Sequence, residues 1–497
     1  MFKLRKYTYP FIFIAFIAIS YWLVYYVLGV YIHIYGNKMD INDLTPWMAK
    51  WVKKDGYEIQ FMTLLTFIYF IFIYCIYKYL DPVYIKNNTK YIIYSFSVFI
   101  FSSFAIYLIT HNNLNKYLFF VIFPFLYKIL FTFFNKKIIL IVSILLSTLL
   151  FFYSFPSLSD YSYFIGPANK LLHSYGLNTF YFQYNLLTIL TFYIMMLFKL
   201  SIIQMHFIML LIFIFWIFVL YRYLAGIFFK NKNYINLFLF SLLIFRALII
   251  DGGPIALPQS STLRLDLWVL CLICIYKFNF ANIVSSLLFC LIYLLDDSFG
   301  FLYLILYILT SFLYLKFSKN IFNLKTLFFI IPIIFTFIFH FSFFNSIVSN
   351  SASIYTSYKF GFENISNSSI YWVIMPIMML CLYLLFLNKI SIFYIIFIFG
   401  TLLIQLIYFY GRSVDNNLYS ISGIFIFIIF YTISLYSTMN KYLLNFSILF
   451  LFIFCTDKIV IFFNNVYSNI HNYNHYINVS YNLNSITTKY NKSKYHH

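Results

Sequence analysis

Long apolar runs recur along almost the whole chain, and they leave few folds open to it. The runs are about 17 to 25 residues long, which is the length an α-helix needs to cross the hydrocarbon core of a membrane. They are continuously apolar, whereas the strands of a membrane barrel alternate in segments of about ten residues. Hydrophobic residues make up 63% of the 497 residues, and only 9% are charged. The sequence therefore predicts an all-α fold, a polytopic transmembrane helical bundle with about 13 to 16 spans.

The predicted spans divide the chain into three parts. Residues 1–137 are N-terminal transmembrane helices of unassigned role, residues 138–463 are the region that carries functional signals, and the polar segment 464–497 is expected to be a flexible tail. Some neighbouring spans are expected to be broken or re-entrant helices. The spans cover roughly residues 10–32, 59–80, 91–110, 117–134, 138–155, 182–198, 203–221, 234–250, 263–278, 280–295, 299–316, 325–345, 370–387, 390–410, 418–437 and 441–463.

The distribution of Lys and Arg predicts the orientation of these spans. Basic loops prefer the cytoplasmic side, which places Asp160 on the outer side. The basic turn at Arg222, Lys230 and Lys232 should also be cytoplasmic. It would lie outside, however, if two spans crossed fully between residues 182 and 221. A half-crossing within residues 182–203 removes this conflict. We therefore predict a multi-pass protein of the plasma (inner) membrane.

This orientation collects the polar segments beside the membrane on one side. With Asp160, the outer side holds residues 251–266, 296–297, 346–369 and 411–417. A shared outer face is what an active site at the membrane surface needs. The net charge of +20 does not indicate a nucleic-acid partner, because the sequence contains no soluble basic domain to bind one.

Asp160 is the strongest single candidate for a functional residue. It lies just past the apolar run 138–155, at the start of the polar stretch SDYSYFIGPANKLLHSYGL. A carboxylate beside hydrocarbon is costly to place, so it suggests a function. The alternative is that Asp160 only caps a helix at the membrane surface.

Three stretches of sequence resemble the GT-C superfamily of integral membrane glycosyltransferases. These are DYSYFIGPANKLLHSYGL with FQYNLL, PQSSTLRLD, and YFYGRSVDNNLYSISG. The first is similar to the first outer loop of that superfamily, with an acidic residue and an amphipathic juxtamembrane helix. The superfamily uses polyprenyl-phosphate sugars and includes protein mannosyltransferase and aminoarabinose transferase-like enzymes. The resemblance implies a GT-C-like fold for residues 138–463 and a catalytic role for Asp160.

The chemistry of such a transfer assigns roles to several residues. It needs a base for the acceptor hydroxyl, which is Asp160. It also needs positive charge for the departing phosphate, which guanidinium groups can bind bidentately. We expect Arg264 and Arg412 to bind this phosphate, with Arg246 as a third candidate. Each arginine has an alternative role, in which it reaches the headgroups or pairs with a nearby Asp such as Asp251, Asp266 or Asp415.

Other residues are candidates for contacts with substrate or metal. We expect Tyr161, Gln183 and Tyr184 to line a sugar pocket, while His173 either contacts substrate or faces lipid headgroups. Asp296 and Asp297 are weak candidates for holding Mg²⁺ or Mn²⁺, and capping of the following helix is preferred. The cysteines, including the Cys271–Cys274 pair, are interpreted as small buried residues, because no second pair or nearby His accompanies them.

The sequence leads to one principal function and leaves alternatives open. The principal prediction is a membrane glycosyltransferase that moves a sugar from a polyprenyl-phosphate donor to a hydroxyl of a lipid, glycan or protein acceptor, with inversion. The alternatives are a lipid-linked oligosaccharide transporter or flippase and a surface polysaccharide polymerase. A carrier is expected to show two related halves, and no repeat is evident in the sequence.

Overall fold

The computed structural model describes ten stretches of the chain, and their regular elements are all helices. The described residues are 136–153, 158–175, 185–248, 257–296, 299–317, 328–343, 371–387, 390–410, 415–435 and 465–471. The predicted spans 10–32, 59–80, 91–110, 117–134 and 441–463 lie outside these residues. The all-α prediction is confirmed for the part of the chain that the structure describes.

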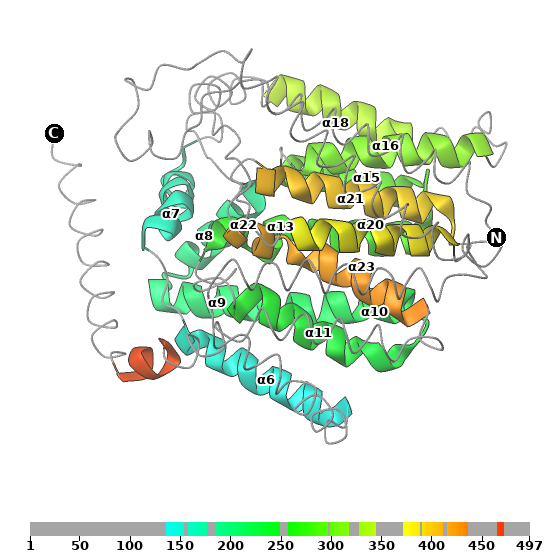
Figure 1. Ribbon diagram of the computed structural model, residues 1–497. Coiled ribbons are helices and arrows are strands. Elements are labelled where there is room, and N and C mark those ends of the chain that lie inside the picture. Colours follow the sequence, from blue (N-terminus) through cyan, green and yellow to red (C-terminus); the bar gives the residue numbers. More distant parts are fainter. Residues whose placement is uncertain are drawn as a thin grey trace, which may run out of the picture. The chain divides into compact units, whose positions relative to one another are not determined.

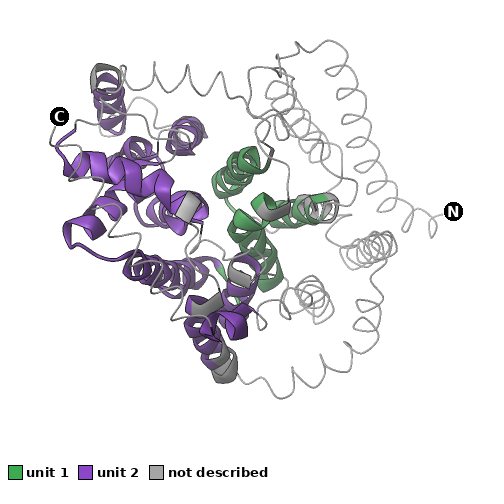
Figure 2. Ribbon diagram, turned by 90° about the vertical axis from the view of Figure 1, so that its left-hand side faces the viewer, with its two compact units in different colours: residues 1–131, 229–231, 355–453 green, residues 132–228, 232–354, 454–497 purple. Residues whose placement is uncertain are grey.

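The described helices belong to two compact units, which are coloured separately in Figure 2. Unit 1 holds the helices between residues 371 and 435 together with Phe229–Asn231. Unit 2 holds the helices between residues 136 and 343 apart from that short segment, and the helical residues 465–471. The last of these lie within the predicted polar tail, so part of that tail is helical.

Unit 2 contains most of the described elements, and most of its α-helices are labelled in Figure 1. They are α6 (Lys136–Tyr153), α7 (Leu158–Leu172), α8 (Leu186–Leu197), α9 (Ile202–Phe215), η2 (Trp216–Tyr221), α10 (Arg222–Phe228), η3 (Lys232–Tyr234), α11 (Ile235–Leu243), η4 (Ile244–Leu248), η5 (Pro258–Ser260), α13 (Thr262–Leu265), α14 (Leu267–Phe278), α15 (Ile283–Leu295), α16 (Phe299–Phe317) and α18 (Ile330–Phe343).

Three described helices are long and apolar enough to cross a membrane. They are Ile202–Phe228, Phe299–Phe317 and Ile392–Phe409. The first joins α9, η2 and α10 into one helix of 27 residues. This helix continues to Phe228, so Arg222 lies inside it and not in the basic turn that the sequence suggested. These three helices indicate a multi-pass membrane protein.

The helix α8 has the length that a half-crossing requires. Its 12 residues span about 18 Å at about 1.5 Å per residue, whereas a full crossing needs about 30 Å. Asn185 is extended before the helix, and Lys199 follows it with a φ of 54°. The α8 helix is therefore shorter than the predicted span 182–198, and the half-crossing stays a prediction.

The helix α7 is amphipathic, as the sequence predicted for the segment that begins at Asp160. Tyr161, Phe164 and Ala168 are buried on one face, while Tyr163 and Lys170 are exposed on the other. The buried face packs against α8, where the ring of Phe164 stacks on that of Phe192. In Figure 1, α7 runs across the direction of α9 and α16. Such a helix is suited to the boundary between a membrane and water.

The packing of α15 against α16 depends on one glycine. A Cβ atom at Gly300 would lie 2.4 Å from the carbonyl oxygen of Ile292 and 2.6 Å from the Cα of Tyr293. Only a residue without a side chain allows α16 to start this close to the end of α15.

The helix α18 packs against α15 and exposes an apolar face. This face carries Ile331, Ile334, Phe335 and Ile338, as expected of a surface in contact with lipid.

Unit 1 has four described helices. They are α20 (Tyr371–Leu387), α21 (Ile392–Tyr410), α22 (Asp415–Ser420) and α23 (Ser422–Leu435). The helix α20 packs against α23 and α21, and the rings of Tyr371 and Phe409 stack with centroids 5.2 Å apart. The α23 helix is buried over nearly its whole length. It contacts all three other described helices of its unit, α20, α21 and α22.

Candidate functional site

The polar segment 258–266 (PQSSTLRLD) is where the predicted span 263–278 is interrupted. It consists of η5, Ser261, α13 and Asp266, which precedes α14 with a φ of −111° and a ψ of 12°. Apart from Gln259, all of its residues are buried. Buried polar groups are costly unless they find hydrogen-bond partners. Broken helices inside membrane proteins are tolerated where protein surrounds them, and they often mark binding sites.

Asp160 contacts this segment directly. It lies in the first turn of α7, where a negative charge is favoured by the helix dipole. The side-chain Nε2 of Gln259 donates a hydrogen bond of 2.8 Å to its Oδ1 atom. Asp160 is half-buried, so the carboxylate keeps some access to the surroundings.

Arg264 also contacts Gln259, at its backbone. Its NH1 group donates a hydrogen bond of 3.1 Å to the backbone carbonyl of Gln259. The guanidinium carbon also lies 5.3 Å from the centre of the Phe299 ring, in a cation–π contact at the start of α16. Asp160 and Arg264, which the sequence proposed as base and phosphate ligand, are thus joined through Gln259.

Asn185 attaches the start of α8 to the segment. It precedes α8, and its Nδ2 group donates a hydrogen bond of 3.0 Å to the carbonyl of Leu263. Segment 258–266 therefore holds the first turn of α7 and the beginning of α8 in place. The polar groups from these three regions lie together in unit 2.

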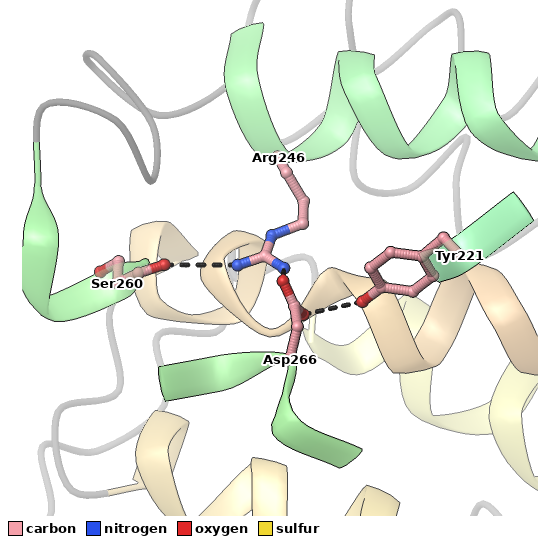
Figure 3. Close-up of polar contacts among 4 residues, drawn as sticks. All are labelled: Tyr221, Arg246, Ser260 and Asp266. Carbon is pink, nitrogen blue, oxygen red and sulfur yellow. Dashed lines mark hydrogen bonds and ion pairs between the residues drawn. The ribbon is translucent and has the colours of Figure 1, made fainter. Parts of the chain in front are cut away.

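A buried ion pair fixes the other end of the segment, as Figure 3 shows. Arg246 pairs with Asp266, and its NH2 group donates a hydrogen bond of 3.3 Å to the carbonyl of Ser260. The hydroxyl of Tyr221 donates a hydrogen bond of 2.7 Å to the other oxygen of Asp266. Arg246 and Asp266 are 0% and 2% exposed. The alternative in which Arg246 pairs with a neighbouring aspartate is confirmed, and a bound phosphate would have to share this guanidinium with Asp266.

Tyr161 has a place in the core of unit 2. Its side chain is completely buried, and its ring lies edge-on to Phe192 with centroids 5.3 Å apart. The hydroxyl lies 3.1 Å from Nδ1 of His206 on α9. Burial raises the pKa of the Tyr161 phenol well above its usual range, so the phenol stays protonated. The residue links α7 to α9, and its predicted contact with a sugar stays a prediction.

The remaining predicted site residues are distributed as follows. His173 lies exposed just after α7. Asp296 is buried, and its Oδ1 accepts a hydrogen bond of 3.0 Å from the backbone N–H of Phe299, so the preferred capping role is confirmed for this residue. Arg412, Gln183, Tyr184 and Asp297 lie outside the described residues.

Neither the cysteines nor the acidic residues form a metal-binding group in the described part of the chain. Cys271, Cys274, Cys290 and Cys381 are buried and free, which confirms their interpretation as small buried residues. Within the described ranges, no three His, Cys, Asp or Glu side chains come together in a way that could hold a metal ion. Mg²⁺ or Mn²⁺ therefore stays a prediction without a described set of ligands.

The sequence did not identify several residues of the site. Gln259 lies within PQSSTLRLD, and Asn185 lies within FQYNLL, so the motifs that carry the resemblance also contain these residues. Tyr221 gave no signal, because an aromatic residue in an apolar run is ordinary. Its role depends on a partner 45 residues away.

Together these observations define a multi-pass helical membrane protein with a buried polar segment that connects the half-buried carboxylate of Asp160 to a buried arginine. No protein family model, curated protein or solved structure matches the chain. The resemblance to GT-C glycosyltransferases therefore stays a prediction.

Proposed function

We propose that this protein is a membrane glycosyltransferase. It transfers a sugar from a polyprenyl-phosphate donor to an acceptor hydroxyl on the outer side of the plasma (inner) membrane, with inversion. The acceptor is a lipid, a glycan or a protein. Asp160 acts as the base, and Arg264 binds the phosphate of the donor.

One observation carries the proposal: Asp160 and Arg264 contact the same residue. Gln259 donates its side-chain amide to the carboxylate over 2.8 Å and accepts the guanidinium at its backbone carbonyl over 3.1 Å. The carboxylate and the guanidinium come from positions 104 residues apart in the sequence, 160 and 264. A base and a phosphate ligand held by one residue suit a reaction whose attacking and leaving groups lie on opposite sides of one carbon atom.

The proposed step needs only one displacement. The acceptor oxygen forms a bond to the anomeric carbon while its proton passes to the Asp160 carboxylate. The bond between the anomeric carbon and the phosphate oxygen breaks, and its electron pair leaves with the polyprenyl phosphate. Arg264 stabilises the charge that gathers on this phosphate. Attack opposite the leaving group inverts the anomeric carbon.

The other predicted contacts complete the proposal. Arg412 and Arg246 are proposed as further phosphate ligands, and His173, Tyr161, Gln183 and Tyr184 as contacts of the sugar or the acceptor. For Arg246 the proposal requires that the phosphate shares the guanidinium with Asp266. For His173 it is supported by the exposed position at the end of α7.

The experiment that tests this function uses cells that lack the gene. Mass spectrometry of their lipid-linked sugars and surface glycans should find a polyprenyl-phosphate sugar that accumulates together with an acceptor that lacks that sugar. Restoring the wild-type gene should reverse both changes. Accumulation of a complete lipid-linked oligosaccharide on the cytoplasmic side would instead indicate a carrier, and unchanged lipids and glycans would refute the proposal.

A further inference from the structure

Two side-chain amides in the site have orientations that chemistry fixes. The Gln259 amide faces a carboxylate oxygen of Asp160, and the Asn185 amide faces the carbonyl oxygen of Leu263. Both partners accept hydrogen bonds, so each amide must present its NH₂ group to them. The carbonyl oxygen of each amide therefore points elsewhere.

These two carbonyl oxygens have no hydrogen-bond partner in the described part of the chain. Oε1 of Gln259 and Oδ1 of Asn185 are both buried and make no hydrogen bond with any described residue. The hydroxyl of Ser261 is also buried and unpaired among the described residues. Asn185 and Ser261 are 2% and 1% exposed. Such groups normally find partners, so three of them around one short segment call for an explanation.

Helix capping does not supply that explanation. Asn185 and Ser261 immediately precede α8 and α13, where Asn and Ser usually accept a hydrogen bond from the first turn. Neither side chain makes such a bond. The bond to Leu263 holds Asn185 at segment 258–266, and Ser261 belongs to this segment.

The chemistry of these atoms selects the kind of ligand. Two amide oxygens can only accept hydrogen bonds, so the matching ligand must offer O–H or N–H donors. A phosphate offers acceptor oxygens and would be repelled by them. We infer that Asn185, Gln259 and Ser261 form a subsite that binds hydroxyl groups of the donor sugar. This inference rests on the proposed function and adds that the sugar is recognised separately from its phosphate.

The subsite adjoins both proposed reacting groups. Gln259 touches Asp160 with its NH₂ group and holds Arg264 with its backbone carbonyl. Gln259 and Asp160 keep part of their surface exposed, and this is the side from which a sugar would have to reach the buried Oε1 atom. A sugar hydroxyl bonded to Oε1 of Gln259 would lie beside the carboxylate that takes the acceptor proton. Gln259 is thus a positioning residue for the base and a specificity residue for the sugar.

The test uses Ser261→Ala, because an unpaired buried hydroxyl and a ligand-binding hydroxyl respond differently to its removal. Removing a hydroxyl that has no partner in the empty protein should leave the melting temperature unchanged or raise it. The same change should reduce sugar binding by about 3- to 10-fold, the effect of one lost hydrogen bond. The matched control is Ser286→Ala in the same unit, because Ser286 is equally buried but donates a hydrogen bond of 2.6 Å to the carbonyl of Phe329. This control should lower the melting temperature and keep the sugar preference.

Binding is measured with the full-length chain in detergent, using bare polyprenyl phosphate and the same lipid carrying glucose, mannose, galactose or arabinose. The wild-type protein should bind at least one sugar-bearing lipid more tightly than the bare lipid, and Ser261→Ala should lose most of that difference while binding the bare lipid normally. The inference is overturned if no sugar strengthens binding, if Ser261→Ala keeps the full preference, or if it loses stability as Ser286→Ala does.

A failure of this inference can be separated from a failure of the proposed function. The sugar preference is a property of binding and does not require transfer. A protein that prefers a sugar through Ser261 but transfers none has the subsite without the transferase activity. A protein that transfers sugar while Ser261→Ala keeps the preference has the activity without this subsite.

Discussion

Replacing Asp266 with alanine should destabilise the protein strongly, because the change leaves a buried arginine without its negative partner. Arg246 is completely buried and Asp266 nearly so. The carboxylate pairs with Arg246 and accepts a second hydrogen bond from Tyr221, so the change also leaves the Tyr221 hydroxyl without this acceptor.

The size of the effect follows from this burial. Removing one partner of a buried ion pair costs about 3–5 kcal/mol. Tyr221→Phe removes only one hydrogen bond to a charged group and should cost about 1.5–3 kcal/mol. Replacing both charges, as in Arg246→Met with Asp266→Leu, should cost far less than the two single changes together, because no uncompensated charge remains.

The measurement is equilibrium unfolding of the purified protein in mixed micelles with a rising fraction of denaturing detergent. Trp268 is a suitable fluorescent reporter, since it is buried and its ring lies edge-on to that of Tyr221 with centroids 5.6 Å apart. The loss in unfolding free energy should be largest for Asp266→Ala and smaller both for Tyr221→Phe and for the double change. A larger loss for Tyr221→Phe than for Asp266→Ala, or additive losses from the two charge changes, would contradict this role of the ion pair.

Three further predictions concern single side chains. Arg264→Ala should raise the KM for the polyprenyl-phosphate donor more than the KM for the acceptor, and equal increases in steady-state kinetics would indicate a role in folding instead. Tyr161→Phe should cost about 0.5–1.5 kcal/mol through loss of the contact with His206. Because burial raises the pKa of this phenol, its contribution to stability is complete below the ordinary tyrosine pKa of about 10 and falls as the pH rises further. Unfolding measured between pH 8 and about pH 11 should therefore show a steeper loss in the wild type than in Tyr161→Phe, and equal slopes would contradict the assignment. Asp296→Ala should cost about 0.5–2 kcal/mol through the lost cap, whereas Asp296→Asn should be nearly neutral in the same unfolding assay.

The sequence predicted the helices well where an apolar run ends at a strong polar boundary. The predicted spans 299–316 and 370–387 differ from α16 and α20 by one residue at one end. The prediction was less accurate where a helix is interrupted inside an apolar or mixed run. The span 263–278 contains the break at Asp266, and the span 418–437 contains the break between α22 and α23. Such breaks depend on tertiary partners, which hydrophobicity does not reveal.

In the candidate site too, the sequence could identify some residues and not others. Asp160 and Arg264 could be proposed because charged residues beside apolar runs are rare and costly. Gln259 could not, because an amide is common in loops and its importance comes from a partner 99 residues away. The same holds for Asn185, whose partner lies 78 residues away. The type of a residue is visible in the sequence, whereas the contact that gives it a role requires the fold.

The most direct test of the central claim is the rate of sugar transfer by Asp160→Asn. The amide keeps the size of the carboxylate and can still bond to Gln259, so expression, membrane insertion and melting temperature should match the wild type. The transfer rate should fall by about 10²- to 10⁴-fold, because the acceptor hydroxyl has lost its base. Asp296→Asn, a matched change at a capping residue, should transfer normally. Transfer at the wild-type rate by Asp160→Asn would contradict the account.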